Sequence, residues 1–275
     1  IAALYAQLIR TVRKESDMKK ITSKGCISLI PEIAVKKREK SKKQQLLLTN
    51  KRVDWGFKQS VQAAQLRIEK QMEQEHKQVL LVSSTLPQEG KSMAAVNLAL
   101  AFMQHEKKTV LIDGDLRKPS VAEMLGMEEQ KGLAEYLKGN AKVKEVLQKK
   151  GDLTVIQGGK VHGNISSLMD ESRMEELMTF LKSEFDYVII DTPPAYLFSD
   201  AAILAGYADR VLYVVRHDMA EIPQIEKGME SFIQEDKLLG YLINRSQKGF
   251  ASYGKYGYGK YGYGKYGYGK YGKYY

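Results

Sequence analysis

The sequence predicts an α/β fold in which a mostly parallel β-sheet is covered by helices on both faces. Two observations predict this class. From residue 77 onward, short and continuously apolar runs alternate with helical patterns, as is typical of strands that are buried on both faces. Acidic residues also follow directly after two of these runs, at the carboxyl ends where parallel sheets bind ligands. With 275 residues, 43% of them hydrophobic, the chain can hold one such domain with appendages.

The first predicted helix covers residues 54–76, where apolar residues at helical spacing form a partial stripe among long polar side chains. Compact apolar runs then predict the strands, and the segments between them include two further helices. The predicted strands are residues 79–83, 109–113, 153–156, 187–191, 211–215 and 239–244, and the predicted helices are residues 92–105 and 173–183.

Residues 1–43 precede this pattern and are predicted to be a juxtamembrane or activator linker, ahead of a main domain that spans residues 44–250. A short strand-like run ends at Pro31, and a basic cluster with a net charge of +5 follows from Lys36 to Lys43. Such a cluster suits an anionic membrane surface, where each basic residue contributes about 1 kcal/mol. No apolar run reaches the length of a membrane-spanning helix, about 18 residues.

The end of the chain, residues 251–275, is predicted to be a flexible tail. Its last 23 residues repeat the pattern Tyr-Gly-Tyr-Gly-Lys. Glycine at this density opposes both helix and strand, because it loses more backbone entropy on ordering than any other residue. The tail exposes ten phenol groups: Tyr253, Tyr256, Tyr258, Tyr261, Tyr263, Tyr266, Tyr268, Tyr271, Tyr274 and Tyr275.

The charge and the metal-binding residue types exclude several function classes. The formal net charge is +10, and half of it lies in the basic cluster and half in the tail lysines, so the remaining chain is neutral. Because both excesses lie in segments predicted to be flexible, rather than on a folded face, nucleic acid is not expected as a partner. The single cysteine excludes an intramolecular disulfide, and the four scattered histidines have no metal-ligand spacing.

A phosphate-binding loop is predicted between the strand 79–83 and the helix that follows, where the chain reads Gly90-Lys91-Ser92. Gly90 lets the backbone approach a phosphate, and the N–H groups at the helix start point at the anion. Lys91 would reach the β- and γ-phosphates, and the Ser92 hydroxyl would bind Mg²⁺. Thr85 replaces the first glycine of the usual GxxxxGK[ST] pattern, and a chance Gly-Lys-Ser in a surface loop is the alternative. The flanking strand and helix favour the phosphate loop, and hence a P-loop NTPase.

Three aspartates at strand ends are candidate site residues. Asp191 closes a strand and would hold Mg²⁺ directly or through water; the alternative is a cap of the turn at Thr192. Asp113 and Asp115 are two residues apart after another strand, so in extended geometry they could share one face of the site. One could bind the metal while the other accepts a proton from an attacking hydroxyl. The alternative is a solvated Asp-Gly-Asp turn.

Taken together, these motifs resemble those of the bacterial tyrosine kinases of capsule and exopolysaccharide synthesis (BY-kinases). In that family, Gly-Lys-Ser, the run Val-Leu-Ile-Asp-Gly-Asp-Leu-Arg-Lys-Pro and the run Tyr-Val-Ile-Ile-Asp-Thr-Pro-Pro are the Walker A, A′ and B motifs, and a tyrosine cluster ends the chain. The resemblance covers about residues 54–275. The run from Cys26 to Pro31 also resembles the segment that follows the second membrane helix of polysaccharide chain-length regulators, either native or joined by construction.

The resemblance implies a protein-tyrosine kinase at the cytoplasmic face of the bacterial plasma membrane. It would transfer the γ-phosphate of ATP, with Mg²⁺, mainly to tail tyrosines of a neighbouring copy, and so regulate polysaccharide synthesis and export. The implied partners are further copies of the chain, a membrane polysaccharide co-polymerase or activator, fused or separate, and a protein-tyrosine phosphatase.

The resemblance also assigns roles to residues. Asp113 would be the base, acting with Lys91 and Asp115, and the ten tail tyrosines would be the phosphoacceptors. Asn244 would read the nucleotide base, although an asparagine that caps a turn is an equal alternative. The implied metal ligands are Ser92, Asp115 and Asp191, and the implied nucleotide-binding residues are Gln88, Glu89, Gly90, Lys91, Ser92, Met93 and Asn244.

Two departures from the family pattern stand out. A Glu-x-x-Arg-x-x-Arg helix motif supports ring formation in the family, and the matching positions here are Gln59, Gln62 and Gln65. A ring of eight copies is therefore in doubt, or is held by amide hydrogen bonds instead. A proline-rich stretch of the family is replaced by residues 161–165.

Two other functions remain open on the sequence. A P-loop ATPase switch of the chromosome-partitioning or septum-positioning type would carry a second lysine early in the loop, where this chain has Leu86. A non-enzymatic protein could bind RNA through stacking and charge in its Gly/Tyr/Lys tail. That second interpretation leaves the acidic motifs unexplained.

Overall fold

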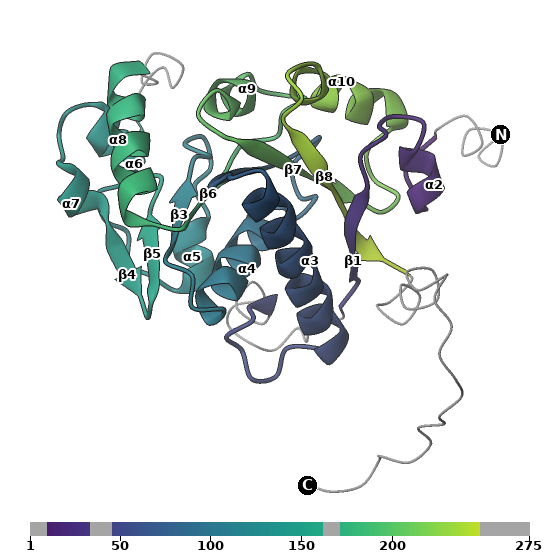
Figure 1. The fold of residues 1–275 in the computed structure, drawn as a ribbon, viewed down its shortest axis with the longest axis horizontal. Helices are drawn as coiled ribbons and strands as arrows, with labels where there is room; N and C mark the ends of the chain where they lie inside the picture. Colours follow the sequence, from purple (N-terminus) through teal and green to yellow (C-terminus); the bar gives the residue numbers. More distant parts are fainter. Residues whose placement is uncertain (1–9, 34–45, 162–170, 248–275) are drawn as a thin grey trace, which may run out of the picture.

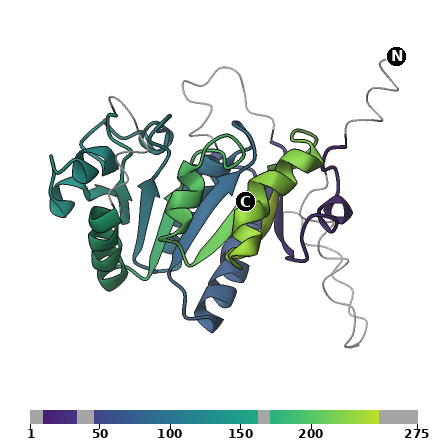
Figure 2. The same ribbon diagram turned by 90° about the horizontal axis from the view of Figure 1, so that it is seen from above.

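The computed structural model describes residues 10–33, 46–161 and 171–247, which form a sheet between two layers of helices (Figures 1 and 2). Within these ranges eight strands form one sheet, in the order β1-β8-β7-β2-β6-β3-β5-β4. Neighbouring strands are parallel except for β4 and β5, which are antiparallel. The strands are β1 (Cys26–Pro31), β2 (Val79–Ser84), β3 (Thr109–Asp113), β4 (Gln148–Lys150), β5 (Leu153–Ile156), β6 (Tyr187–Asp191), β7 (Arg210–Arg216) and β8 (Leu238–Ser246).

The helices divide between the two faces because successive strand residues point in opposite directions. In β2, for example, Leu80 and Val82 belong to one hydrophobic cluster, and Val79 and Leu81 belong to the other. The first cluster includes α3 (Trp55–Gln74), α4 (Lys91–Gln104) and α5 (Val121–Leu125). The second includes α2 (Glu15–Met18), α6 (Leu133–Leu137), α7 (Val143–Val146), α8 (Glu171–Glu184), α9 (Asp200–Ala205) and α10 (Ile222–Gln234).

The structure confirms the predicted fold class and the predicted strands and helices, whose ends shift by at most two residues. The sequence analysis missed β4, with three residues, and the helices α2, α5, α6, α7 and α9, with four to six residues each. Such short elements contain too few turns to show a periodicity. It also missed α10, although Ile225, Met229 and Phe232 are spaced at helical intervals and all are buried.

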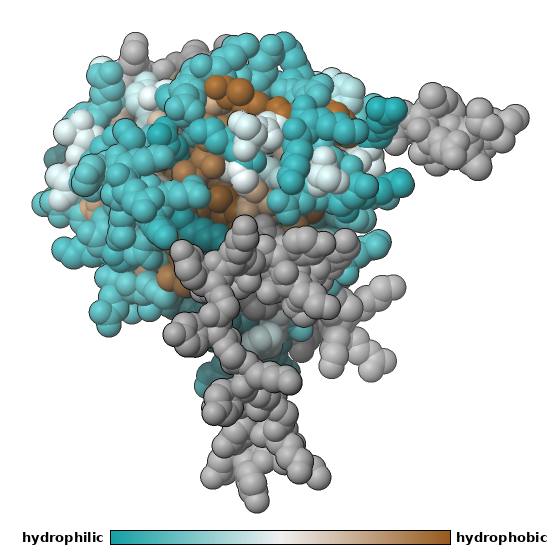
Figure 3. Space-filling model, turned by 45° about the vertical axis from the view of Figure 1, so that its right-hand side comes forward, coloured by the Kyte–Doolittle hydropathy of each residue, from teal (hydrophilic) through white to brown (hydrophobic). Residues whose placement is uncertain are grey.

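Helix α3 begins at Trp55 because Asp54 caps it: the Asp54 carboxylate accepts a hydrogen bond from the backbone N–H of Phe57, at 2.9 Å. Its buried face packs on the sheet and on α4. The large apolar side chains that remain exposed among the described residues are Trp55, Leu66, Tyr196, Leu197, Ile203 and Ile233. The face in Figure 3 is accordingly mostly hydrophilic, with hydrophobic residues gathered in limited areas.

The described part of the predicted linker, residues 10–33, is packed against the sheet. Strand β1 is an edge strand beside β8, and Ile27 and Ile30 lie buried against α3. The Ser28 hydroxyl donates to the carbonyl oxygen of Ser60 in α3, at 3.0 Å. Part of this segment thus belongs to the same core as the main domain, and the boundary at residue 43 stays a prediction. The basic cluster and the tail lie outside the described residues.

Membrane-spanning helices were not predicted. No helix within the described ranges combines the length and the apolar character that a bilayer crossing requires.

The packing of β1 predicts the effect of a single substitution. Ile27→Ala should lower the free energy of unfolding by about 2–4 kcal/mol, because it removes buried methylene groups and leaves a cavity. Urea unfolding measures the change, with Ser23→Ala, at an exposed position just before β1, as the control. A loss below about 0.5 kcal/mol, the usual range of a surface substitution, would show that β1 does not belong to the core.

Candidate active site

The site is formed by the carboxyl ends of three adjacent strands, β2, β6 and β3. Their register aligns Asp113 at the end of β3 with Asp191 at the end of β6. The same register aligns Asp191 with Val82 of β2, just before the glycine-lysine loop. The sheet therefore brings together two carboxylates and a loop that are far apart in the sequence.

The loop between β2 and α4 has a left-handed turn at its end. Gln88 has φ of 67° and Gly90 has φ of 98°, a region that side chains disfavour. Glycine is required at residue 90 for a second reason, because a Cβ atom there would lie 2.1 Å from Nδ2 of Asn244. The turn is held from outside: Nη1 of Arg216 donates to the Gln88 carbonyl oxygen at 3.3 Å, and Nδ2 of Asn244 donates to that of Glu89 at 2.7 Å.

Lys91 is the first residue of α4, and its ammonium group lies among the acids. Nζ donates to Oδ2 of Asp115 at 3.0 Å and to Oγ of Ser92 at 3.1 Å, and it lies 3.8 Å from Oδ1 of Asp191. Burial lowers the pKa of Lys91, but the charges of Asp191 and Asp115 outweigh it, so the pKa is raised above its ordinary value. The lysine is therefore held fully charged.

The carboxylates outnumber this one lysine, and their oxygens are incompletely satisfied. Asp191 is fully buried, and neither of its oxygens has a hydrogen-bond partner among the described residues. Asp113 accepts hydrogen bonds through Oδ2 from the backbone N–H groups of Ser120 and Val121, at 2.8 and 2.9 Å, whereas its Oδ1 has no partner there. Burial, and for Asp113 also the charge of Asp191, raises the pKa of both carboxyl groups.

This residue set fits a divalent cation that is shared with phosphates. Unpartnered buried oxygens of Asp191 next to the Ser92 hydroxyl and Asp115 are hard oxygen ligands of the kind Mg²⁺ prefers. No group of three or more His, Cys, Asp or Glu side chains in the described ranges has the spacing of a complete metal site. A complete set of protein ligands is not needed, since Mg²⁺ usually binds one or two carboxylates and completes its coordination shell with phosphates and water.

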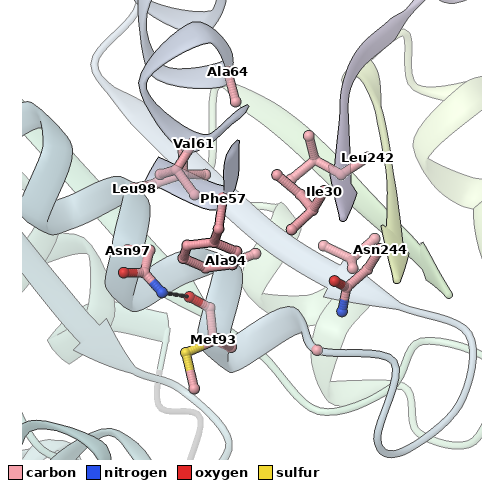
Figure 4. Close-up of a pocket in the computed structure, with 12 residues that line it drawn as sticks. Ile30, Phe57, Val61, Ala64, Met93, Ala94, Asn97, Leu98, Leu242 and Asn244 are labelled. Atoms are coloured by element: carbon pink, nitrogen blue, oxygen red, sulfur yellow. Dashed lines mark hydrogen bonds between the residues drawn. The ribbon is translucent and has the colours of Figure 1, made fainter. Parts of the chain in front are cut away.

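An apolar pocket lies beside the loop, between β1, α3, α4 and β8 (Figure 4). Phe57, Val61, Met93 and Leu242 line it, and Asn244 stands at its edge near Gly90. The Asn244 amide is already engaged by the protein, because Nδ2 binds the Glu89 carbonyl oxygen and Oδ1 accepts the N–H of the next residue. In this state Asn244 supports the loop, and its predicted contact with a base stays a prediction.

Comparison with known proteins decides the family. The family model described as NUBPL iron-transfer P-loop NTPase matches residues 75–204. The tyrosine-protein kinase CpsD of Streptococcus agalactiae is 34% identical over 183 residues, which cover 65% of this chain and 80% of CpsD. The tyrosine-protein kinase YwqD of Bacillus subtilis is 35% identical over 182 residues, 65% of this chain and 77% of YwqD. The chain belongs to the bacterial tyrosine kinases.

A solved structure supports the fold independently. The kinase domain of the Escherichia coli tyrosine kinase ETK superposes with a TM-score of 0.75 at 24% identity, over 92% of this chain and 99% of that domain. The prediction of an ATP-dependent tyrosine kinase of capsule and exopolysaccharide synthesis is confirmed by these relatives, and the roles of the individual motif residues stay predictions. The resemblance of the N-terminal segment to chain-length regulators stays a prediction.

The structure also shows contacts of this bacterial tyrosine kinase that the sequence analysis missed. Arg117 donates twice to the buried carboxylate of Asp200, and its guanidinium carbon lies 4.3 Å from the ring centre of Phe198. Through this contact, the loop that contains Asp115 is held against the first residue of α9. Arg117 was part of a quoted motif, but nothing in the sequence indicates its partner 83 residues away.

The three glutamines at the ring-motif positions differ in exposure. Gln59 and Gln62 are half-buried and bind each other, with 3.2 Å between Nε2 of Gln59 and Oε1 of Gln62. Gln65 is fully buried and donates to Glu69 on its own helix. Gln65 therefore offers nothing to a neighbouring copy in this structure. Within the segment 161–165, only Val161 lies among the described residues. None of the ten predicted phosphoacceptor tyrosines does.

The raised pKa of Asp113 predicts a pH dependence of stability. The fold favours the neutral form of the Asp113 carboxyl group. Its contribution to the free energy of unfolding is therefore fully present below the ordinary pKa of 3.8 and is lost as pH rises through the raised pKa. Asp113→Asn cannot ionise and keeps an oxygen for the two N–H groups. The thermal midpoint of the nucleotide-free variant should therefore rise relative to that of the wild type between about pH 4 and about pH 7. A difference that does not change with pH would contradict the assignment.

Proposed function

We propose that this kinase transfers the γ-phosphoryl group of ATP, with Mg²⁺, to tyrosines in the C-terminal tail of a neighbouring copy. One observation carries the proposal: a P-loop lysine lies among three aspartates, and two of these, Asp113 and Asp191, have buried oxygens without a hydrogen-bond partner among the described residues. An excess of buried negative charge is costly unless a cation compensates it. A magnesium ion, when bound, would supply that charge and neutralise the phosphates.

Each residue then has a role. The N–H groups from Gln88 to Met93 face the phosphates, and Lys91 contacts the terminal ones. Ser92, Asp115 and Asp191 hold the metal ion. Asn244, at the edge of the apolar pocket, would contact the base. Most of the rate enhancement comes from positioning and charge neutralisation, because phosphoryl transfer needs little covalent help from the protein.

Asp113 is the proposed base. A tyrosine hydroxyl has a pKa of about 10, so an acceptor for its proton is useful as the bond to phosphorus forms. The tyrosine oxygen bonds to the γ-phosphorus, the bond from that phosphorus to the β,γ-bridging oxygen breaks, and ADP leaves. The proton passes to Oδ1 of Asp113, the oxygen without a partner. Asp115 suits this role less, because Lys91 and the Lys118 N–H already bind its two oxygens.

The tail suits the role of substrate because, in an assembly of copies, a tethered segment has a high effective concentration at a neighbouring site. Each phosphate adds roughly −1.5 to −2 charges, so three would overturn the charge of its five lysines. Repeated phosphorylation would then turn an attractive contact into a repulsive one and loosen an assembly. We further propose that the chain works at the cytoplasmic face of the plasma membrane, with a co-polymerase or activator and a phosphatase as partners.

The rival ATPase switch is disfavoured by one residue. Leu86 stands where that class carries its second lysine, and its side chain packs against the hydrophobic core. ATP hydrolysis stimulated by DNA or lipid, without phosphotyrosine, would favour that rival.

Substitutions in the site should abolish phosphotyrosine. With Mg²⁺ and ATP, Lys91→Met and Asp113→Asn should each lower autophosphorylation by about 100-fold or more, because they remove the phosphate contact and the base. Immunoblotting for phosphotyrosine measures this. Lys108→Met, at an exposed position before β3 and so at the opposite end of that strand, is the matched control. Undiminished labelling in both site variants would refute the assignment.

The tail should be the main acceptor and should react in trans. A chain without residues 253–275 should bind ATP with wild-type affinity but lose most of the label. Mixed with full-length Lys91→Met protein, the truncated chain should phosphorylate the tail of that inactive partner, as mass spectrometry would show. Absence of label on the inactive partner, with label restored only when site and tail share a chain, would mean transfer in cis.

A further inference from the structure

The side chain of Glu89 lies fully buried inside the phosphate loop, where the catalytic scheme does not use it. Its Oε2 accepts a hydrogen bond from the backbone N–H of Leu86 at 2.6 Å, and its Oε1 accepts one from the N–H of Arg216, on β7, at 3.2 Å. The carboxylate thus joins the first half of the loop to the neighbouring strand.

This bridge occurs where the loop departs from the usual sequence. Thr85 occupies the position of the first glycine, and its hydroxyl is 3.1 Å from that of buried Tyr213. Gln88 holds a left-handed conformation that a residue with a side chain adopts only under restraint from its surroundings. The described contacts of Arg216 and Asn244 with the turn supply part of this restraint, and Glu89 fixes the opposite half.

Glu89 differs from a carboxylate whose hydrogen bonds outweigh its burial. Burial raises its pKa to about 7, and the backbone N–H groups and the charge of Arg216 offset this only in part. Asp209 offers a direct contrast, since its Oδ2 also accepts two backbone hydrogen bonds, from Gln78 at 3.0 Å and Val79 at 2.8 Å. Burial raises the pKa of Asp209 as well, but there the two hydrogen bonds, together with the charges of Lys182 and Lys77, outweigh burial and lower the pKa.

We propose that Glu89 is a positioning residue for nucleotide binding: its carboxylate holds the loop against β7, so that the N–H groups from Gly90 onward are already arranged for phosphates. The inference rests on the proposed nucleotide site. Preorganisation of this kind raises affinity because the loop need not be ordered when the ligand binds.

The test is Glu89→Gln, which keeps the size of the side chain but offers one acceptor where two are needed. The dissociation constant for ADP with Mg²⁺, measured by calorimetric titration, should rise by about tenfold or more, in keeping with the loss of a hydrogen bond to a charged group. The thermal midpoint of the nucleotide-free protein at neutral pH should stay the same or rise, because a costly buried charge is removed. The KM for ATP should rise more than kcat falls.

Asp209→Asn is the matched control, because it removes the same chemistry at the amino-terminal end of β2. It should lower the thermal midpoint and leave the dissociation constant unchanged. Glu89→Asp, which keeps the charge but is one methylene shorter, should also weaken binding.

Binding by Glu89→Gln within twofold of the wild type would overturn the inference. So would a lowered midpoint with a proportional loss of binding, which would indicate a structural role only, or wild-type affinity in Glu89→Asp. A wild-type protein that binds no nucleotide would instead refute the proposed site itself.

Discussion

The structure depends on one electrostatic constraint, the gathering of Asp113, Asp115 and Asp191 around the single ammonium group of Lys91. Lys91 is close to two of these carboxylates, at 3.0 and 3.8 Å, and cannot compensate all three. Burial raises the pKa of Asp113 and of Asp191, and the charge of a neighbouring aspartate raises each of them further. Such a site suits an enzyme that must bind a cation and a triphosphate together, because the uncompensated negative charge of its residues attracts the cation.

The order of the strands creates this constraint and also connects it to the rest of the chain. Adjacent β2, β6 and β3 place the loop and the acids together, while β7 and β8 support the loop from one side through Arg216 and Asn244. Strand β1 pairs with β8, and Ile30 of β1 lines the apolar pocket beside the nucleotide loop. In our account, Glu89 completes this support from within the loop.

The sequence predicted the fold and the centre of the site for identifiable reasons. The strands ending at Asp113 and Asp191 are short apolar runs, and parallel pairing necessarily brings their carboxyl ends together. Side-chain contacts across long separations could not be predicted in this way. The partner of Glu89 is 127 residues away, and the pair Arg117–Asp200 is 83 residues apart, so only the folded sheet reveals them. The burial of Gln65 was equally hidden, because a glutamine in a polar helix gives no sign of facing the core.

The most direct test of the account is the dependence of nucleotide binding on the metal ion. The thermal midpoint of the wild-type protein should be compared with ADP alone and with ADP plus Mg²⁺, since a ligand that binds only the folded state stabilises it in proportion to its affinity. If the buried carboxylates bind a cation, Mg²⁺ should clearly increase the rise in thermal midpoint that ADP causes. Asp191→Asn should remove most of that increase. An equal shift with and without Mg²⁺ in the wild type would contradict the account.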